Sequence, residues 1–430
     1  MLEQRLRDAK PAIERWFQLE WLGKSAPIYS SVDVRNAGFK LTQVDTNLFP
    51  GGWNNLRADM GPRAVQALQC AFQTMHPAPR RVLIVPENHT RNTFYLSNVL
   101  RLQQFCRRAG VDVRVGSLNP DITQSTEITL PNGELLVLEP VVRQGDRLGL
   151  IDFDPCLVLL NTDLSGGVPL ALDALDQPIL PPVHAGWYVR RKHDHFQKYA
   201  ELCDRFGQRL GLDPWLINPL FSHVDGIDFA DGTGLEALQA QVDDLLTRIR
   251  CKYIEHGIDE TPFVIIKANN GTYGMGIMTV RDASDLDHLN RKTRNKMSVI
   301  KDGQTVNEVL IQEGVPTRER VHLATAEPVV YLINGQVVGG FYRTHAGRGI
   351  DENLNAPGAT FAPWQWASDA QLPDSLYANG VIARLATLAA SQELSTDTAH
   401  NAVPSCSLAL DEPWVLPVRT STSIAVSCSR

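Results

Sequence analysis

A glycine-rich loop between two strand-like segments constrains this chain more than any other feature of its sequence. Residues 263–267 form an apolar run of β type that ends in Lys267, and residues 277–280 form a second such run. The loop between them provides four residues that we expect to contact a ligand: Gly271, Tyr273, Gly274 and Gly276. Glycine allows a backbone to approach a phosphate closely and to turn its N–H groups toward the anion. The segment therefore predicts a β-hairpin whose loop covers phosphate groups.

The order of the lysine and the glycines distinguishes this loop from two common nucleotide-binding motifs. A Walker loop has its lysine after the glycines and is followed by a helix, whereas Lys267 comes before them. A Rossmann fingerprint opens a helix, whereas a strand-like run follows Gly276. In a hairpin of this form, Lys267 can reach the α- and β-phosphates of ATP while the loop covers the remainder. A glycine-rich hairpin without a ligand is the alternative interpretation.

A further strand-like run ends in polar residues that suit a nucleotide. Residues 309–315 have the sequence VLIQEGV, which places Gln312, Glu313 and Val315 at the end of the predicted strand. A strand end of this kind can offer backbone groups to the edge of an adenine and a carboxylate to a ribose. An ordinary edge strand is the alternative.

A predicted hairpin then brings a glutamate and an arginine close to a loop that is rich in oxygen ligands. Asn334-Gly335 is a strong two-residue turn signal, and Glu327 and Arg343 lie at the two ends of the segment that contains it. The loop that follows holds hard oxygen ligands within five positions: Asp351, Glu352, Asn353 and Asn355. Mg²⁺ prefers such ligands, and an arginine can hold a phosphoryl group during transfer. We therefore expect this part of the chain to handle Mg²⁺ and phosphate.

The order of these elements resembles the ATP-grasp superfamily, in which two α+β lobes hold ATP between them. Over residues 29–390 the chain is more closely similar to the proteobacterial ATP-grasp-type glutamate–cysteine ligases. The segments that carry this resemblance are VDVRNAGFKLTQVDTNLFPGGWNN, VPENHTRNTFYLSN, KANNGTYGMGIMTVRDAS, LNRKTRNKM, IQEGV and EPVVYLINGQVVGGFYRTHAGRGIDENLNAPG. The glycine loop and the RTHAGRGIDENLNAPG loop are the most specific of them.

The resemblance implies an ATP-dependent ligase that joins L-glutamate to L-cysteine in the first step of glutathione biosynthesis. The γ-carboxylate of glutamate would become an acyl phosphate, from which the amine of cysteine would displace phosphate. Lys267 and the glycine loop would position the phosphates of ATP, and Arg343 would stabilise the oxygens of the transferred group. Mg²⁺ would bridge the β- and γ-phosphates, and the expected ligands are Glu327, Glu352 and Asn355.

Three polar segments that follow strand-like runs predict the amino-acid pocket. Residues 30–55, 87–92 and 161–167 form these segments, and ligands of open α/β sheets bind where the strands end. The candidate contacts are Arg35, Asn36, Asp45, Asn47, Glu87 and Arg91. Either Arg35 or Arg91 would bind the α-carboxylate of an amino acid, and its ammonium group would need a carboxylate: Glu87, Asp45 or Asp163. Helix capping and turn formation are the alternative roles of these residues.

Hydrophobic periodicity predicts an α/β domain over residues 1–180. Strand-like runs at 81–86, 111–115 and 156–160 flank a helical stripe at 91–109, which is the pattern of a parallel sheet with covering helices. The many strand-like runs later in the chain come in pairs, which indicates an α+β domain.

The later domain is expected over residues 181–394 and is ATP-grasp-like by resemblance. The tail, residues 395–430, is rich in Ser, Thr, Pro and Cys and lacks periodicity. We expect it to be disordered, or to result from a change of reading frame, and assign it no chemistry.

Charge and composition exclude several other classes of protein. A formal net charge of -7 argues against a nucleic-acid binder. Apolar runs stay well short of the roughly 20 residues that a membrane helix needs, and residues 1–24 lack the apolar core of a signal peptide. The seven cysteines form no CxxC pair, which argues against a zinc site. We therefore predict a cytoplasmic protein without membrane or nucleic-acid partners, and make no prediction of its oligomeric state.

Three alternatives to this function remain at the level of the sequence. The first is an ATP-grasp ligase that joins a different carboxylate and amine, because side-chain preference cannot be inferred from residues 30–55 and 87–92. The second is an ATP-binding module without catalytic activity. The third is a carbohydrate- or metabolite-binding protein whose glycine loop binds no nucleotide.

Overall fold

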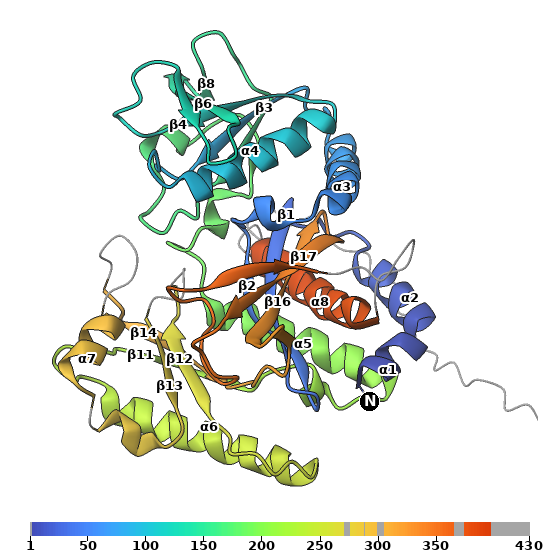
Figure 1. The fold of residues 1–430 in the computed structure, drawn as a ribbon, viewed down its shortest axis with the longest axis vertical. Helices are drawn as coiled ribbons and strands as arrows, with labels where there is room; N and C mark the ends of the chain where they lie inside the picture. The colour runs from blue at the N-terminus through green and yellow to red at the C-terminus, as the bar shows by residue number, and fades with distance from the viewer. Residues whose placement is uncertain (1, 271–275, 288, 299–304, 365–373, 397–430) are drawn as a thin grey trace, which may run out of the picture.

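The computed structural model describes residues 2–270, 276–287, 289–298, 305–364 and 374–396. Within these ranges the chain forms three β-sheets with covering helices, and a separate hairpin of two short strands (Figure 1). The helices are α1 Leu2–Asp8, α2 Lys10–Glu20, α3 Gly61–Thr74, α4 Thr93–Arg108, α5 Lys192–Leu210, α6 Leu235–Glu255, α7 Arg291–Ser298 and α8 Asp374–Thr396. Short 3₁₀ turns lie at Trp53–Asn55, Ala58–Met60, Leu170–Leu172, Val183–Ala185, Pro214–Leu216 and Ala283–Leu286. No helix of the described residues is both long and apolar enough to span a bilayer.

A central antiparallel sheet joins segments from the two ends of the chain. Its strand order is β18-β17-β16-β1-β2, and β15 also pairs with β16. The bounds are β1 Tyr29–Asn36, β2 Leu41–Asn47, β15 Arg320–Val321, β16 Ala324–Ile333, β17 Gln336–His345 and β18 Thr360–Pro363. Asn334 and Gly335 both have positive φ, at 50° and 72°, so the predicted two-residue turn joins β16 to β17.

Strand alternation gives the central sheet one helical face and one polar face. Ser30 Oγ lies 2.8 Å from Thr387 Oγ1 of α8, and Figure 1 shows α8 packed along this sheet. Successive side chains of a strand point to opposite faces, so Ser31, Asp33 and Arg35 of β1 face away from α8. The polar face of the sheet is therefore free to line a site.

The polar stretch at residues 30–55, which the sequence suggested as a substrate loop, is mainly the β1–β2 hairpin of this sheet. Its alternation of apolar and polar residues arises because one face packs on α8 and the other does not. β1 pairs with β16, so the sheet combines strands from both sides of residue 180, where we placed a domain boundary. The division into domains itself remains a prediction.

An α/β unit lies beyond one end of the central sheet (Figure 1). Its strand order is β10-β9-β3-β4-β6-β5, parallel throughout except for β5. The bounds are β3 Arg81–Pro86, β4 Asp112–Ser117, β5 Thr126–Thr129, β6 Leu135–Pro140, β7 Val142–Gln144, β8 Arg147–Gly149, β9 Leu157–Asn161 and β10 Ile179–Leu180. The three strands and the helix predicted in this part of the sequence are confirmed.

A small antiparallel sheet of order β11-β14-β12-β13 lies on the long helix α6 (Figure 1). The bounds are β11 Phe221–Asp225, β12 Val264–Ala268, β13 Ile277–Val280 and β14 Glu308–Glu313. Val264, Ile266 and Ile311 pack in one core with α6. The alternating residues Ile265, Lys267 and Gln312 therefore project from the opposite face.

Two predictions lie outside the described residues. One concerns the tip of the glycine loop, residues 271–275, and the other concerns most of the tail, residues 397–430. Together the three sheets confirm a mixed α/β fold.

Candidate active site

Two cavities meet on the polar face of the central sheet. The first has a volume of about 720 Å³ and lies between this sheet and the small sheet on α6. Eight of the predicted site residues line it: Arg35, Asp45, Lys267, Gln312, Glu313, Val315, Glu327 and Asn355.

The second cavity, of about 1250 Å³, lies between the central sheet and the carboxyl ends of β3 and β9. Of the predicted residues it is lined by Asp45, Asn47, Arg343 and Asn355. Asp33, Asp45 and Asn355 border both cavities, so the two spaces adjoin at these residues. A third hollow beside the first is lined by Gly276 and Glu352, and it also includes Asn355.

Lys267 is held by an irregularity in β2. Asp33 pairs with Asp45 whereas Val34 pairs with Gln43, which leaves Val44 as the extra residue of a β-bulge. A bulge leaves a residue unpaired in the ladder, and the Val44 carbonyl accepts a hydrogen bond of 2.6 Å from Lys267 Nζ. Burial lowers the pKa of Lys267 to about 7, although nearby Asp45 favours the charged form.

A second lysine lies beside the same aspartate. Lys192 Nζ, in the first turn of α5, is 2.6 Å from Asp45 Oδ1. Despite burial, Lys192 and Lys267 hold the pKa of Asp45 well below its usual range. The Asn269 carbonyl accepts from the Lys192 N–H at 2.8 Å, and Asn269 Oδ1 accepts from the His193 N–H at 3.0 Å. The start of the glycine loop is therefore fixed to the same helix turn as Lys192.

Arg343 joins two carboxylates of the central sheet. Its Nη1 lies 2.6 Å from Asp33 Oδ2 and 2.7 Å from Glu327 Oε1. Burial raises the pKa of Asp33 even though Arg343 opposes this effect. The pKa of Glu327 is instead lowered, because the charges of Arg35 and Arg343 outweigh the effect of burial. This buried array makes Arg343 a fixed cation at the wall of the second cavity.

Arg35 is engaged by protein acceptors. Its Nε lies 2.9 Å from Glu327 Oε2, and its other nitrogens donate to the carbonyls of Val315, Ile350 and Glu352. The guanidinium thereby fastens the oxygen-rich loop to the strand end at Val315. It is not available here as a free cation for a substrate carboxylate.

Glu313 also has its carboxylate engaged within the protein. Its Oε2 accepts from Lys40 Nζ at 2.7 Å and from the Leu220 N–H at 2.8 Å, and Trp215 Nε1 lies 3.2 Å from each oxygen. Burial lowers the pKa of Lys40 to about 8 while Glu313 favours its charged form. A ribose hydroxyl would have to compete with these donors.

Three predicted substrate contacts line neither cavity. Asn36, at the end of β1, donates to Glu3 Oε1 at 2.7 Å and to Glu319 Oε1 at 3.1 Å. Glu87 Oε1 accepts from the Asp163 N–H at 3.1 Å, which joins the loops after β3 and β9. Arg91 is exposed. Only two of the six predicted substrate contacts, Asp45 and Asn47, line the second cavity.

The three predicted metal ligands differ in what surrounds them. Both oxygens of Glu327 face guanidinium groups, and those of Glu352 accept from Arg348 Nη1 at 2.7 Å and from the Gly349 N–H at 2.6 Å. Asn355 borders both cavities and the adjoining hollow. Oxygen donors suited to Mg²⁺ are thus present around the junction, but cations already neutralise the carboxylates.

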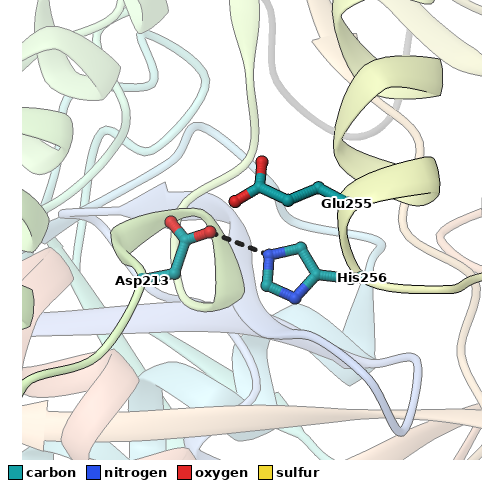
Figure 2. Close-up of side chains that lie close together, drawn as sticks. All are labelled: Asp213, Glu255 and His256. Carbon is teal, nitrogen blue, oxygen red and sulfur yellow. Dashed lines mark hydrogen bonds and ion pairs between the residues drawn. The ribbon is translucent and has the colours of Figure 1, made fainter.

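A separate group with metal-ligand chemistry lies elsewhere. In the described ranges, three such side chains come together at Asp213, Glu255 and His256, with ligand atoms within 4.8 Å (Figure 2). His256 Nε2 is 2.8 Å from Asp213 Oδ2, and Lys252 Nζ lies 3.1 Å from Asp213 and 2.9 Å from Glu255. The Lys252 ammonium therefore already pairs with both carboxylates, and none of the four residues lines either cavity.

The first cavity has a surface that fits a nucleotide. Its apolar wall includes Val44, Ile265, Ala268 and Ile277, which suits a base. Gln312 lines the same cavity, and its Nε2 is buried without a hydrogen-bond partner among the described residues. An unpaired buried donor is costly, and a ring nitrogen of adenine is an acceptor that would relieve that cost.

Sequence reasoning missed two residues of the junction as site candidates. Asp33 stood within the polar stretch at 30–55 but without a feature that set it apart from its neighbours. Lys192 belongs to a basic segment, residues 184–195, whose charge suited contact with phosphate or substrate and equally a solvated helix start, so the residue itself was not singled out.

These features define an α/β protein with two adjoining cavities whose linings are rich in charged and polar side chains. A model of the glutamate-cysteine ligase family matches residues 3–394. The chain belongs to the glutamate–cysteine ligase family, and it is a ligase of glutathione biosynthesis, as the motifs predicted. The family implies ATP as a reactant and small molecules as the other substrates.

One solved structure agrees with this assignment. A crystal structure from Methylobacillus flagellatus, assigned as gamma-glutamylcysteine synthetase, is 51% identical with a TM-score of 0.86, over 92% of this chain and 96% of that one. D-alanyl-alanine synthetase A from Vibrio cholerae is 11% identical with a TM-score of 0.35, over 71% and 80% of the two chains. A glutathione synthetase-like effector from Globodera pallida is 10% identical with a TM-score of 0.34, over 84% of each. The last two similarities are too low to carry an argument. No curated protein matches the chain.

Proposed function

We propose that the first cavity binds ATP and the second binds the two amino acids, and we name them the nucleotide cavity and the amino-acid cavity. The observation that carries this proposal is the junction: Asp33, Asp45 and Asn355 border both spaces. Lysines lie on the nucleotide side of this junction, and Arg343 lies on the amino-acid side. A phosphoryl group can therefore pass from one cavity to the other without crossing the protein.

The reaction proceeds in two steps at this junction. An oxygen of the γ-carboxylate of glutamate attacks the γ-phosphorus of ATP, the bond to the bridging oxygen breaks, and ADP leaves. The amine nitrogen of cysteine then attacks the acyl carbon, the carbon–oxygen bond to phosphate breaks, and the amine loses a proton. The products are γ-glutamylcysteine, ADP and phosphate. Fixed charges that are already in position stabilise such transfers without reorganisation of the site.

Lys267 and Lys192 are the cations that we assign to the phosphates of ATP. Asp45 holds Lys192 and the Val44 carbonyl holds Lys267, and the single charge of Asp45 compensates only part of the charge of the two lysines. The glycine loop continues directly from Asn269, which is bound to the first turn of α5. Gln312 and the backbone at Val315 are assigned to the adenine, in keeping with the unpaired Gln312 Nε2.

Arg343 is assigned to the γ-phosphate and the acyl phosphate. Its guanidinium is buried, is fixed between Asp33 and Glu327, and borders the amino-acid cavity. Planar guanidinium groups match the geometry of phosphate oxygens. Asp45 and Asn47 are assigned to the amino-acid substrates, because both project from β2 into the same cavity.

Mg²⁺ is assigned to the oxygen donors around the junction, which are Glu327, Asn355 and, from the adjoining hollow, Glu352; binding through the two carboxylates would replace their contacts with Arg35, Arg343 and Arg348. Such an ion usually takes one or two carboxylates and completes its shell with water and phosphate oxygens. When bound, it would neutralise charge on the β- and γ-phosphates.

We also propose a cytoplasmic location, and no membrane-spanning helix lies among the described residues.

Product formation tests the reaction directly. ADP and dipeptide are measured with Mg-ATP and glutamate, with and without cysteine, and hydroxylamine is used in place of cysteine to trap the acyl phosphate as a hydroxamate. We expect dipeptide only when both amino acids are present, and hydroxamate with glutamate alone. Replacing cysteine by serine or alanine, or glutamate by aspartate, tests for a different carboxylate and amine.

Lys267→Met provides the variant for the nucleotide cavity, and Leu135→Ala, an exposed position on β6, is its control. We expect the first to lose ADP formation and ATP-dependent thermal stabilisation, and the second to keep both. Unchanged ATP binding by the Lys267→Met protein would contradict the assignment of the first cavity.

A further inference from the structure

Two exposed aromatic rings lie at the opening of the amino-acid cavity. Most residues that line this cavity are buried or half-buried, and the exposed ones are Gly51, Asn92, Phe94 and Phe361. Phe94 is 51% exposed and Phe361 is 41% exposed. Exposed lining residues mark where a cavity meets solvent, so these two large apolar side chains lie at its mouth.

The two rings stack on each other across this mouth. Their centroids are 5.9 Å apart and their planes differ by 17°. Phe94 belongs to the first turn of α4 in the α/β unit, whereas Phe361 belongs to β18 of the central sheet. The contact therefore connects the two bodies of structure that form the walls of the cavity.

A column of aromatic rings supports the pair from the interior. Phe361 meets the edge of Phe341 at 5.3 Å between centroids, Phe341 lies 5.3 Å from Tyr331, and Tyr331 lies 4.8 Å from Trp53. Trp53, Tyr331 and Phe341 are buried. Phe341 and Tyr331 line the cavity as well, so one of its walls is aromatic from the buried end to the mouth.

Hydrolysis of the acyl phosphate is a side reaction that a closed cavity would prevent. Water competes with cysteine for the acyl phosphate: its oxygen attacks the acyl carbon, the carbon–oxygen bond to phosphate breaks, and glutamate and phosphate are released. ATP is then consumed without product. Exclusion of water from a closed site prevents side reactions of this kind.

We propose that the stacked Phe94–Phe361 pair closes the mouth of the amino-acid cavity and keeps bulk water from γ-glutamyl phosphate until cysteine attacks. The inference rests on the proposed function, because it requires the acyl phosphate to form in this cavity. The polar groups that we assign to chemistry are centred on Asp33 and Asp45, which are half-buried, whereas the two phenylalanines are exposed. The two phenylalanines act by closing the site and make no contact with the reacting atoms.

The ratio of ADP to dipeptide measures this closure. Both products are quantified in the same reaction for the unmodified enzyme, Phe94→Ala, Phe361→Ala and Phe94→Tyr, with saturating substrates. We expect a ratio near that of the unmodified enzyme for Phe94→Tyr, which keeps the ring, and a several-fold higher ratio for both alanine variants. ADP released with glutamate alone should rise in the same two variants. Leu135→Ala is the matched control, because Leu135 is 52% exposed and lies outside the cavity.

Equal ratios in the unmodified enzyme and in both alanine variants would overturn the closure. Because the two side chains are about half-exposed, each alanine variant is expected to fold, and thermal unfolding checks this for each separately. Failure of the proposed function has a different signature, since the unmodified enzyme would then form no ADP that depends on glutamate. A loss of rate without a change in ratio would also count against the closure.

Discussion

Lys40 and Glu313 form an ion pair of 2.7 Å in which neither side chain is exposed. Lys40 lies in the loop that connects β1 to β2 of the central sheet, and Glu313 is the last residue of β14 in the small sheet. The Lys40 ammonium also lies 4.1 Å above the ring of Trp215, whose Nε1 donates to the same carboxylate. The pair thus ties together the two sheets that enclose the nucleotide cavity.

Removal of one partner of this pair should destabilise the protein strongly. Lys40→Met leaves the Glu313 carboxylate buried without its counter-charge, at an expected cost of about 3–5 kcal/mol in the free energy of unfolding. The double variant Lys40→Met/Glu313→Gln should recover part of this loss, because no charge is then buried alone. Urea unfolding of the two single variants and the double variant measures the coupling. Additive losses would contradict the proposed interaction.

ATP binding should depend on pH through Lys267. Burial lowers the pKa of Lys267 to about 7, so the free enzyme loses this positive charge as the pH rises through that value. The phosphates of ATP favour the ammonium form, so binding above pH 7 must bring a proton. Apparent affinity should therefore weaken by up to about tenfold per pH unit above pH 7.

Calorimetric titration of ATP in buffers of different ionisation heat measures this proton uptake. Lys267→Arg should bind without it, because a guanidinium stays charged throughout the range. Proton uptake that persists in Lys267→Arg would assign the effect to another group.

Two asparagines of the β1–β2 hairpin should respond differently to alanine. Asn47 lines the amino-acid cavity, whereas the Asn36 amide donates to Glu3 and Glu319 at the far end of β1. We expect Asn47→Ala to raise the KM for an amino acid, by about tenfold for the loss of one polar contact. Asn36→Ala should leave every KM within a factor of about two, because Asn36 lines neither cavity. Steady-state kinetics with each substrate varied in turn distinguishes the two positions.

Local patterns of the sequence predicted local structure well. The apolar runs and the Asn334-Gly335 turn depend on neighbours in the chain, and the structure contains the corresponding strands and turn. The pairing of β1 with β16 was not predictable in this way, because it joins residues about 300 positions apart, such as Asp33 and Val329. A stretch that resembled a polar loop therefore forms two neighbouring strands of the sheet.

The same limit applies to the candidate site. Residue type identified Arg35 and Glu313 as suitable for a substrate carboxylate and a ribose, but their partners lie far away in sequence. Glu327 is 292 residues from Arg35, and Lys40 is 273 residues from Glu313. Whether a charged side chain is available to a ligand depends on such partners, which a single sequence does not reveal. Lys267 was recognised because its glycine loop is contiguous with it.

A substitution of Arg343 tests whether this residue acts in phosphoryl transfer rather than in ATP binding. Its side chain borders the amino-acid cavity but not the nucleotide cavity, and it contacts Asp33 and Glu327 through Nη1. Arg343→Lys keeps the charge but loses the planar donor geometry, so we expect kcat to fall by about 10²–10³ while the Kd for ATP changes little. Calorimetry and single-turnover ADP formation measure the two quantities, and thermal unfolding checks that the buried carboxylates still allow folding. A large loss of ATP affinity with a preserved kcat would move Arg343 to the nucleotide side of the junction, and phosphoryl transfer would then need another cation on the amino-acid side.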